Sequence, residues 1–576
     1  MNLRNLKAMR RLLSLCLIAA LVWSAAPVSY ADVYHANPKL VVIVVIDQFR
    51  GDYLDRYRSE LKAANGFNLF LKRGAYFSGC YYGYANTKTA PGHATLGTGA
   101  YTDGHGIGSN EWWDLSRNTD RPISSVEDER YKVVGTFDDL PVLQPPPAPK
   151  PTDARIGSSP LNLQATTLGD EVRLATGGEA KLFGVSLKDR AAILPAGQTA
   201  NGAFWIDNAT GRFVTSTYYM SSLPDWATKF NKGPRPAQAV KEANLPDTTQ
   251  FYAMVGRTAA ANGYELDFAK ALIEGESLGQ HGITDVLTVS LSANDILGHQ
   301  MGPDSDDERE MVVSLDRDLD AFFGYLDKKI GLGNVMIALS ADHGVAPVPA
   351  QAAKLGVAAA RVDLETLVTN LNSALNEKLS PGKKVDYFLP AQEFPYLALK
   401  EKAFGPLKEK AAEEAVLAAL PEAFAKLGAP PQPANNNDTP EATRKYEESR
   451  VEPDPRIAFA RTKVDLAAGK IPPTEFGRLI AHSYTDHGGW YVMVVPTAYQ
   501  MEYQNGNQTT HFSPWSYDRH VPLAFFGAEF QPGYYREAVE PVDMAVTFAS
   551  LLGVNRPSAA VGRVLTEALK PVPAGK

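Results

Sequence analysis

The chain has 576 residues, of which 44% are hydrophobic and 21% charged, as in an ordinary globular protein that is long enough to bury a large core. Its 57 Lys and Arg residues against 65 Asp and Glu give a formal net charge of −8. An acidic chain of this kind is a poor candidate for non-specific nucleic-acid binding, so nucleic acid is not expected as a dedicated partner.

The N-terminus has the pattern of a secretory signal over residues 1–31. Four basic residues precede an apolar stretch at 12–26, and the small residues Ser29 and Ala31 fit cleavage after Ala31. An uncleaved anchor helix is the alternative, but the stretch is shorter than the roughly 20 residues that a membrane span needs. Cleavage would lower the net charge to −12 and leave Cys80 as the sole cysteine, so no internal disulfide could form. We expect a periplasmic or secreted protein without stable membrane insertion.

Three short apolar runs that each lead to an aspartate are the main structural pattern of the chain. The runs and their aspartates are 39–46 with Asp47, 286–291 with Asp295, and 334–340 with Asp342. Such runs, rich in β-branched residues and without alternation, predict strands buried on both faces, as in a parallel sheet. Because ligand sites in open α/β sheets lie beyond the carboxyl ends of the strands, we expect the three carboxylates to meet at one edge of one sheet.

The order of the elements predicts one α/β domain over residues 32–576. Apolar residues at helical spacing in 311–330, between two predicted strands, indicate the crossover helix of a βαβ unit, and a second helix is expected at 542–552. Further strands are expected at 490–495 and 521–526. The fold class is therefore a three-layer sandwich, with a mostly parallel central sheet and helices on both faces. Three cap-like insertions are expected at about 114–180, 195–260 and 350–475.

A candidate nucleophile lies in the Gly- and Thr-rich segment 86–99. Pro91 suits the first turn of a helix, which places Thr89 just before that turn in a capping position. A helix N-terminus presents free N–H groups and a partial positive charge, both of which favour a phosphate. The alternative, favoured for the segment taken alone, is that Thr89 only caps the helix.

Two groups of residues are candidate metal ligands. Asp295 and His299 have the i, i+4 spacing that puts two side chains on one face of a helix. Asp342 and His343 are adjacent at a predicted strand end. Mixed oxygen and nitrogen ligands suit Zn²⁺. Each aspartate alone could be a turn former or a cap, but three strand ends with spaced histidines favour a dinuclear metal site.

Seven short motifs in a fixed order resemble those of the alkaline phosphatase superfamily. They are Val45–Arg50, Thr87–Thr95, His105–Asn110, Ser186–Ala191, Asp295–His299, Ala341–Gly344 and Thr510–His511. The chain resembles most closely the type I phosphodiesterase and nucleotide pyrophosphatase branch, and within it the periplasmic, Sphingomonas-type alkaline phosphatases that use threonine as nucleophile. The resemblance covers most of residues 39–554 and implies an alkaline-phosphatase-like fold.

This resemblance implies two Zn²⁺ per chain and a phosphothreonine intermediate on Thr89. One zinc ion would be held by Asp295, His299 and His511. The other would be held by Asp47, Asp342 and His343, with the Thr89 oxygen bridging toward them. Two metals about 4 Å apart can clamp the attacking and leaving oxygens of a phosphoryl transfer.

The resemblance further implies that Asn110, Lys188 and Arg190 bind the non-bridging phosphate oxygens. Alternation along an extended segment would put Lys188 and Arg190 on one side. Taken alone, this charged segment could be a solvated turn. In the family, the Lys-x-Arg pair accompanies a preference for monoesters, because a terminal phosphate carries an extra charged oxygen. We therefore expect a metal-dependent hydrolase of small phosphate monoesters, with weaker diesterase activity.

Other functions are less consistent with the residues. A diesterase or nucleotide pyrophosphatase is the main alternative. Sulfatases of this fold place Cys or Ser at the nucleophile position, where this chain has Thr89. A non-catalytic binding protein would not need the complete set of ligands and nucleophile. Phe512 follows His511 where relatives usually carry glycine, and His487 is a competing imidazole.

Overall fold

A computed structural model describes residues 36–117, 121–135, 157–208, 210–244, 251–427, 456–504 and 506–571. The expected signal at 1–31 lies outside these ranges. Within them, none of the helices combines the length and the apolar character that crossing a bilayer requires.

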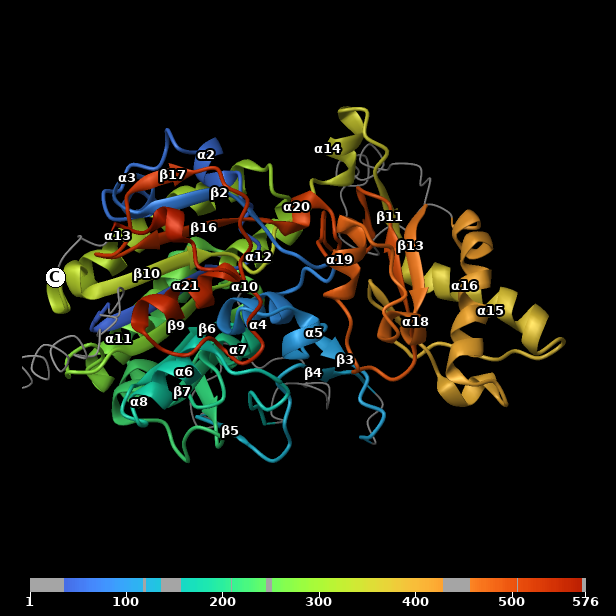
Figure 1. Cartoon of the computed structure of the whole chain (residues 1–576), viewed down its shortest axis with the longest axis horizontal. Helices are drawn as coiled ribbons and strands as arrows, with labels where there is room; N and C mark the ends of the chain where they lie inside the picture. The colour runs from blue at the N-terminus through green and yellow to red at the C-terminus, as the bar shows by residue number, and fades with distance from the viewer. Residues whose placement is uncertain are drawn as a thin grey trace, which may run out of the picture.

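The larger of two lobes is built on a ten-stranded sheet (Figure 1). The strand order is β17 (Gly533–Tyr535), β2 (Ala75–Tyr81), β16 (His520–Phe526), β10 (Val335–Ser340), β1 (Leu40–Ile46), β9 (Asp285–Leu291), β6 (Leu182–Ser186), β7 (Gly202–Ile206), β8 (Phe213–Ser216) and β5 (Val133–Val134). The five strands from β10 to β7 are parallel, and antiparallel pairs appear only toward the two edges. This confirms the expected mostly parallel α/β sheet.

The three predicted strands that lead to aspartates are neighbours in the middle of this sheet. Every residue of β1, β9 and β10 is buried, as their mostly apolar sequences predicted. In the register of β1, Ile46 pairs with Leu291 and Val45 pairs with Ser340. The three strands therefore end at the same edge of the sheet, and the segments that carry the three aspartates all begin at this edge.

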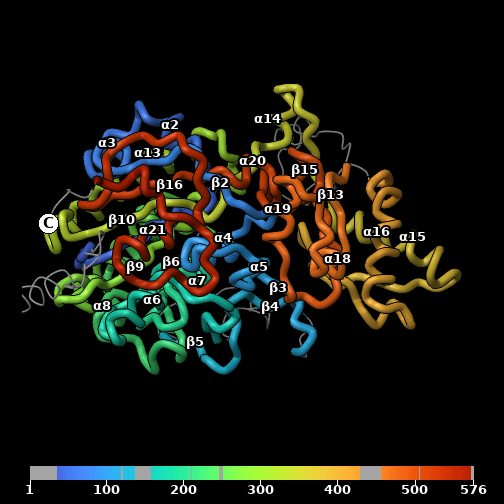
Figure 2. The backbone as a smooth tube through the Cα atoms, in the orientation of Figure 1, coloured from blue at the N-terminus to red at the C-terminus, as the bar shows by residue number. Residues whose placement is uncertain are grey.

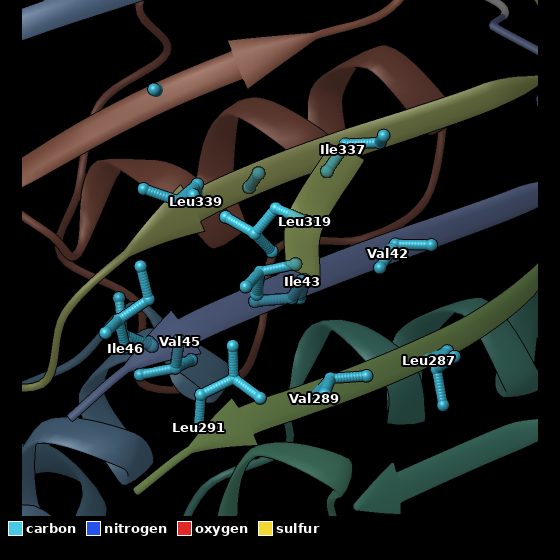
Figure 3. Close-up of a cluster of buried hydrophobic side chains, with 14 of the residues drawn as sticks. Val42, Ile43, Val45, Ile46, Leu287, Val289, Leu291, Leu319, Ile337 and Leu339 are labelled. Carbon is cyan, nitrogen blue, oxygen red and sulfur yellow. The ribbon is translucent and has the colours of Figure 1, made fainter. Parts of the chain in front are cut away.

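Helices cover both faces of the sheet. On one face, α13 (Asp306–Lys329) packs against α11 (Ala259–Glu276) and α3 (Phe67–Arg73). On the other face lie α4 (Thr89–Thr98), α6 (Leu168–Ala175), α7 (Asp189–Ala196) and α21 (Asp543–Leu552). The expected helices at 311–330 and 542–552 correspond to α13 and α21. Figure 3 shows how Leu319 of α13 lies over Ile43 and Leu339 on the sheet.

A smaller lobe follows β10 in the chain. It has a three-stranded sheet of β12 (Tyr396–Ala398), β14 (Tyr491–Pro496) and β13 (Ile457–Thr462), and a core of its own with α15 (Leu364–Leu379) and α16 (Glu409–Ala425). Figure 2 shows the chain building this lobe in yellow and orange and returning in red to the larger lobe.

The strands do not follow the expected insertion boundaries. β7 and β8 lie within 195–260, yet they extend the central sheet beyond β6 instead of forming a separate unit. The run at 490–495 was expected to resume the core, but β14 is the middle strand of the smaller sheet. Short apolar runs carry no information about which sheet they join, because pairing depends on contacts far away in the chain.

A core substitution tests the packing between helix and sheet. We expect Leu319→Ala to lower the midpoint of thermal unfolding by about 5 °C or more, because it removes fully buried methyl groups and leaves a cavity. The matched control is Leu174→Ala on α6, where the leucine is 70% exposed and a shift under about 1 °C is expected. Equal shifts in the two variants would contradict the assigned packing.

Candidate metal and phosphate site

The residues predicted as metal ligands come together at the carboxyl edge of the sheet. His343 Nε2 lies 3.5 Å from Asp47 Oδ1 and 3.5 Å from Asp342 Oδ2. The rings of His343 and His511 are stacked, with centroids 3.7 Å apart. Two overlapping groups are compact enough to hold a metal ion: Asp295, His299 and His511 form one, and Asp47, Asp295 and His343 form the other.

The short helix α12 (Ala293–Met301) positions the first of these groups. Asp295 lies in its first turn and His299 one turn later, so the predicted i, i+4 pair does share a helix face. Asp295 Oδ1 lies 3.2 Å from His299 Nε2 and 3.7 Å from His511 Nε2.

Backbone carbonyls orient all three imidazoles in the same way. The Nδ1 atom of His299 bonds to the carbonyl of Thr509 at 2.9 Å, and that of His511 to the carbonyl of Thr87 at 2.6 Å. His343 Nδ1 lies 2.9 Å from the carbonyl of Gly344. A carbonyl can only accept, so Nδ1 carries a proton in each ring, and Nε2 is the nitrogen that faces the candidate ligand group. Metal-binding histidines are held in this manner.

Unsatisfied buried atoms support a cation at this edge. Asp47 Oδ1, Asp342 Oδ2 and His343 Nε2 are buried and accept or donate no hydrogen bond among the described residues. Orphaned buried polar atoms are rare because each costs free energy. These three atoms belong to one predicted ligand set, so the residues present fit a divalent metal there.

Crowding of charge shifts the pKa values of the carboxyls in opposite directions. Burial, followed by the charges of Asp295 and Asp342, raises the pKa of Asp47 well above its usual range. Burial also acts against the charged form of Asp295, but Lys188 and His299 outweigh it and hold the Asp295 pKa well below normal. The pKa of His511 is lowered by burial and by the neighbouring histidines, so this imidazole stays neutral, as a metal ligand must be.

Thr89 is the first residue of α4, with Lys88 in the cap position. The expectation that Thr89 itself caps the helix is wrong, because Thr89 is the first helical residue. The residue in the cap position, Lys88, makes no side-chain hydrogen bond to the helix. Instead, the Ala90 N–H donates to Asn110 Oδ1 at 2.8 Å. Asn110 therefore satisfies one N–H of the helix N-terminus and keeps its amide hydrogens for another acceptor.

The first turn of α4 is held against both ligand groups. Thr87, two residues before Thr89, holds the His511 ring through its carbonyl. Gly92 lies so close to Asp342 that an added Cβ would be 2.2 Å from the Asp342 carbonyl oxygen. His93, for which no role was predicted, bonds to the Thr89 carbonyl and has Nδ1 3.2 Å from Asp342 Oδ2.

Lys188 lies between two of the predicted ligands. Its Nζ atom is 2.6 Å from Asp47 Oδ2 and 2.7 Å from Asp295 Oδ2. Burial disfavours the charged amine, but Asp295 and Asp47 outweigh burial and raise the pKa of Lys188. Lys188 therefore stays charged and links the two groups.

The expected extended geometry of Lys188 and Arg190 is wrong. β6 ends at Ser186 and α7 begins at Asp189, so Lys188 is the residue before a helix and Arg190 lies in the first helical turn. The two side chains nevertheless line one cavity together with Tyr252. Arg190 also lines a second cavity with Asn110.

Gln48 is a residue of the site that the sequence did not reveal. Its backbone N–H donates to Asp342 Oδ1 at 3.0 Å, and its side-chain amide donates to Asp295 Oδ1 at 2.7 Å. Gln48 has φ 63°, a left-handed conformation that is uncommon outside glycine. Gly298 leaves room for its side chain, since a Cβ there would be 2.3 Å from Gln48 Oε1. Gln48 thus couples one member of each predicted ligand set.

The neighbour of His511 adopts the conformation that glycine favours. Phe512 has φ 99°, and its N–H donates to Thr87 Oγ1 at 3.2 Å. Its ring lies over the Lys88 ammonium at 4.6 Å. The competing imidazole, His487, lies elsewhere: it stacks on Trp112 with centroids 4.7 Å apart.

Comparison with known proteins assigns the chain to a family. The model of the type I phosphodiesterase / nucleotide pyrophosphatase family matches residues 41–453. The chain belongs to this family. It is 32% identical to alkaline phosphatase PafA of Elizabethkingia meningoseptica over 92% of this chain and 95% of that protein. It is 31% identical to alkaline phosphatase PhoV of Synechococcus elongatus, over 93% and 94% of the two chains.

A solved structure supports the same family membership. The crystal structure of wild-type PafA superposes with a TM-score of 0.77 at 29% identity, covering 93% of this chain and 99% of that one. The alkaline-phosphatase-like fold expected from the motifs is thereby confirmed.

Gln48 provides a test of how the two ligand groups are coupled. If the site binds a divalent metal, we expect Gln48→Ala to weaken its affinity for Zn²⁺ roughly tenfold, because carboxylates that lose an outer partner are less well oriented. Competition with a chromophoric chelator measures the affinity directly and needs no enzymatic turnover. Gln238→Ala, at an exposed position of α9 (Arg235–Ala243), is the control. Unchanged zinc affinity in Gln48→Ala would contradict this role.

Proposed function

We propose that the protein is a periplasmic or secreted alkaline phosphatase that hydrolyses phosphate monoesters, with weaker action on diesters, through Thr89. The observation that carries the proposal is the set of three unsatisfied buried atoms on Asp47, Asp342 and His343, at the edge where α4 presents Thr89. The alkaline phosphatases among its relatives, which match nearly the whole chain, support the same reaction.

In this proposal two Zn²⁺ ions are held by the two ligand sets. Asp295, His299 and His511 hold one, and Asp47, Asp342 and His343 hold the other. Bound there, the ions would supply Lewis-acid stabilisation of charge on the attacking and leaving oxygens. Asp295 also lies close to His343, so it is shared between the two groups in their present geometry.

Thr89 is the nucleophile in the proposed reaction. Its Oγ gives up its proton and forms a bond to phosphorus, while the bond from phosphorus to the alcohol oxygen breaks and the alcohol leaves. Water then attacks the phosphothreonine from the vacated side, which releases inorganic phosphate and returns the threonine hydroxyl. The free N–H groups and the dipole of α4 favour the anion throughout.

Asn110, Lys188 and Arg190 bind and orient the phosphate. Asn110 offers its amide N–H, since its Oδ1 already accepts from Ala90. Arg190 offers a planar fork of donors and has an unpartnered buried Nε. Lys188 now lies between Asp47 and Asp295, and cations bound by those carboxylates would free its ammonium for a phosphate oxygen.

The alternative function is that of a phosphodiesterase or nucleotide pyrophosphatase, which the matching family model names. A diester phosphate carries one charge and a monoester carries two near neutral pH. Two cationic side chains beside the phosphate site therefore favour the monoester.

The nucleophile is tested by substitution of Thr89. We expect Thr89→Ala to lower kcat/KM for p-nitrophenyl phosphate about a thousandfold or more, because no oxygen remains to attack phosphorus. Thr89→Ser keeps the hydroxyl and should retain far more activity. Zinc content and the unfolding midpoint of both variants check that the site and fold persist. Activity of Thr89→Ala close to that of the wild type would end the nucleophile assignment.

Substrate preference is tested with the two basic residues. We expect Arg190→Ala and Lys188→Ala each to lower kcat/KM for a phosphate monoester roughly tenfold more than for its methyl diester, because the monoester has the extra charge. Lys229→Ala, at an exposed position of α8 (Asp225–Lys232), should change neither rate. Equal losses on both substrates would refute the assigned role and favour the diesterase.

A further inference from the structure

A cavity of about 360 Å³ lies between the two lobes and borders the proposed phosphate site. Asn110 and Arg190, the proposed phosphate ligands, line one side of it. The smaller lobe supplies much of the other side, through Tyr396 on β12, Tyr491 on β14 and Glu502 on β15 (Gln500–Glu502). A group joined to the phosphate through one ester oxygen can therefore reach this cavity.

Aromatic rings line the cavity, and the polar atoms of three of them are already used by the protein. Trp113 Nε1 donates to the Pro390 carbonyl at 3.0 Å. The hydroxyl of Tyr396 donates to the carbonyl of Ser483, and that of Tyr491 donates to the carbonyl of Thr485. Trp113 and Tyr396 therefore offer ring surfaces to a ligand instead of hydrogen bonds, whereas the Lys463 ammonium already lies 5.3 Å from the centroid of the Tyr491 ring. Ring surfaces bind apolar groups and, through the negative charge of the π face, cations.

The charged groups of the smaller lobe that line the cavity are carboxyls. Glu393 is paired with Lys88, whose Nζ is 2.5 Å from Glu393 Oε2. Glu502 has no ion-pair partner in the part of the chain that the structure describes, and its two hydrogen bonds, from Phe394 N and Gln504 Nε2, are long at 3.3 and 3.4 Å. Burial, and then the charge of Glu393, raises the pKa of Glu502 to about 8. A cation beside Glu502 would favour the ionised carboxylate and so oppose this rise in pKa.

We propose that this cavity receives the organic part of the substrate and selects phosphate monoesters of amino alcohols, with the ammonium between the aromatic rings and Glu502. The proposal rests on the proposed function, because it takes Asn110 and Arg190 as the phosphate ligands. A zwitterionic ester matches both ends of the cavity: its phosphate meets Arg190, and its ammonium meets the carboxyl. An ester with an uncharged alcohol group of the same shape would occupy the space between the rings but offer Glu502 no positive charge.

The test compares phosphocholine with 3,3-dimethylbutyl phosphate, in which carbon replaces the quaternary nitrogen. The two esters have nearly the same shape and differ in one positive charge. For each enzyme, kcat/KM for phosphocholine is divided by kcat/KM for 3,3-dimethylbutyl phosphate. The wild-type value of this ratio is then divided by the value for Glu502→Gln. This double ratio cancels the different reactivity of the two leaving groups. We expect this double ratio to be roughly 5 to 10, which means that the wild type prefers phosphocholine more strongly than Glu502→Gln does.

Two further variants make the result specific. Trp112→Leu removes a ring of the cavity wall and should also lower the preference for phosphocholine. This second variant keeps the test decisive if Glu502→Gln fails to fold. Glu414→Gln is the matched control: it removes the same charge from α16 of the same lobe, at a side chain that is 56% exposed, and should leave the ratio unchanged.

The contrary results separate this proposal from the proposed function. A double ratio near one for both Glu502→Gln and Trp112→Leu, with hydrolysis that still depends on Thr89, overturns the amino-alcohol subsite alone. Hydrolysis of neither ester, and none of p-nitrophenyl phosphate, overturns the proposed function itself. If Glu414→Gln lowers the preference for phosphocholine as much as Glu502→Gln does, the preference reflects the overall charge of the protein. That result also overturns the subsite.

Discussion

The arrangement of the larger lobe depends on three carboxylates that are buried at the ends of adjacent parallel strands. Asp47, Asp295 and Asp342 would repel one another strongly if nothing compensated their charge, because burial weakens the screening that water provides. Lys188 compensates part of this charge through its two short contacts. The unsatisfied oxygens that remain are what a divalent cation would bind. The outer contacts of the site, including those of Gln48, keep these carboxylates at separations at which they can share cations.

The smaller lobe takes part in the same electrostatic arrangement. Glu393 of that lobe pairs with Lys88, which directly precedes Thr89 and is fully buried. Loss of this pair is costly on the lysine side, because Lys88 is fully buried and its charge would lose its carboxylate partner, whereas the Glu393 side chain is 30% exposed. The position of the first turn of α4 is thus coupled to the docking of the smaller lobe. The cavity beside Glu502 is lined by both lobes, so its shape also depends on how the smaller lobe docks.

Much of the sheet could be predicted, and so could the convergence of the candidate ligands, because both depend on short local patterns in the sequence. An unbroken apolar run that ends on an aspartate is a feature of a few consecutive residues, and so is the spacing of Asp295 and His299. The role of Gln48 could not be predicted, since its bonds reach 294 and 247 positions along the chain. The geometry of Lys188 was missed for a related reason: a three-residue pattern does not say whether a strand continues or a helix starts. Membership of β7 and β14 in one sheet or the other likewise depends on distant partners.

The bond between the His511 ring and the Thr87 carbonyl joins residues 424 positions apart. Such a contact closes almost the whole chain into a loop, and contacts of this kind form late because the entropy of closing the loop must be overcome first. During synthesis, a chain that ends between Thr89 and His511 would have the proposed nucleophile but lack the ring that the Thr87 carbonyl holds. The candidate ligand group of Asp295, His299 and His511 is therefore complete only after the last of these three residues has been made.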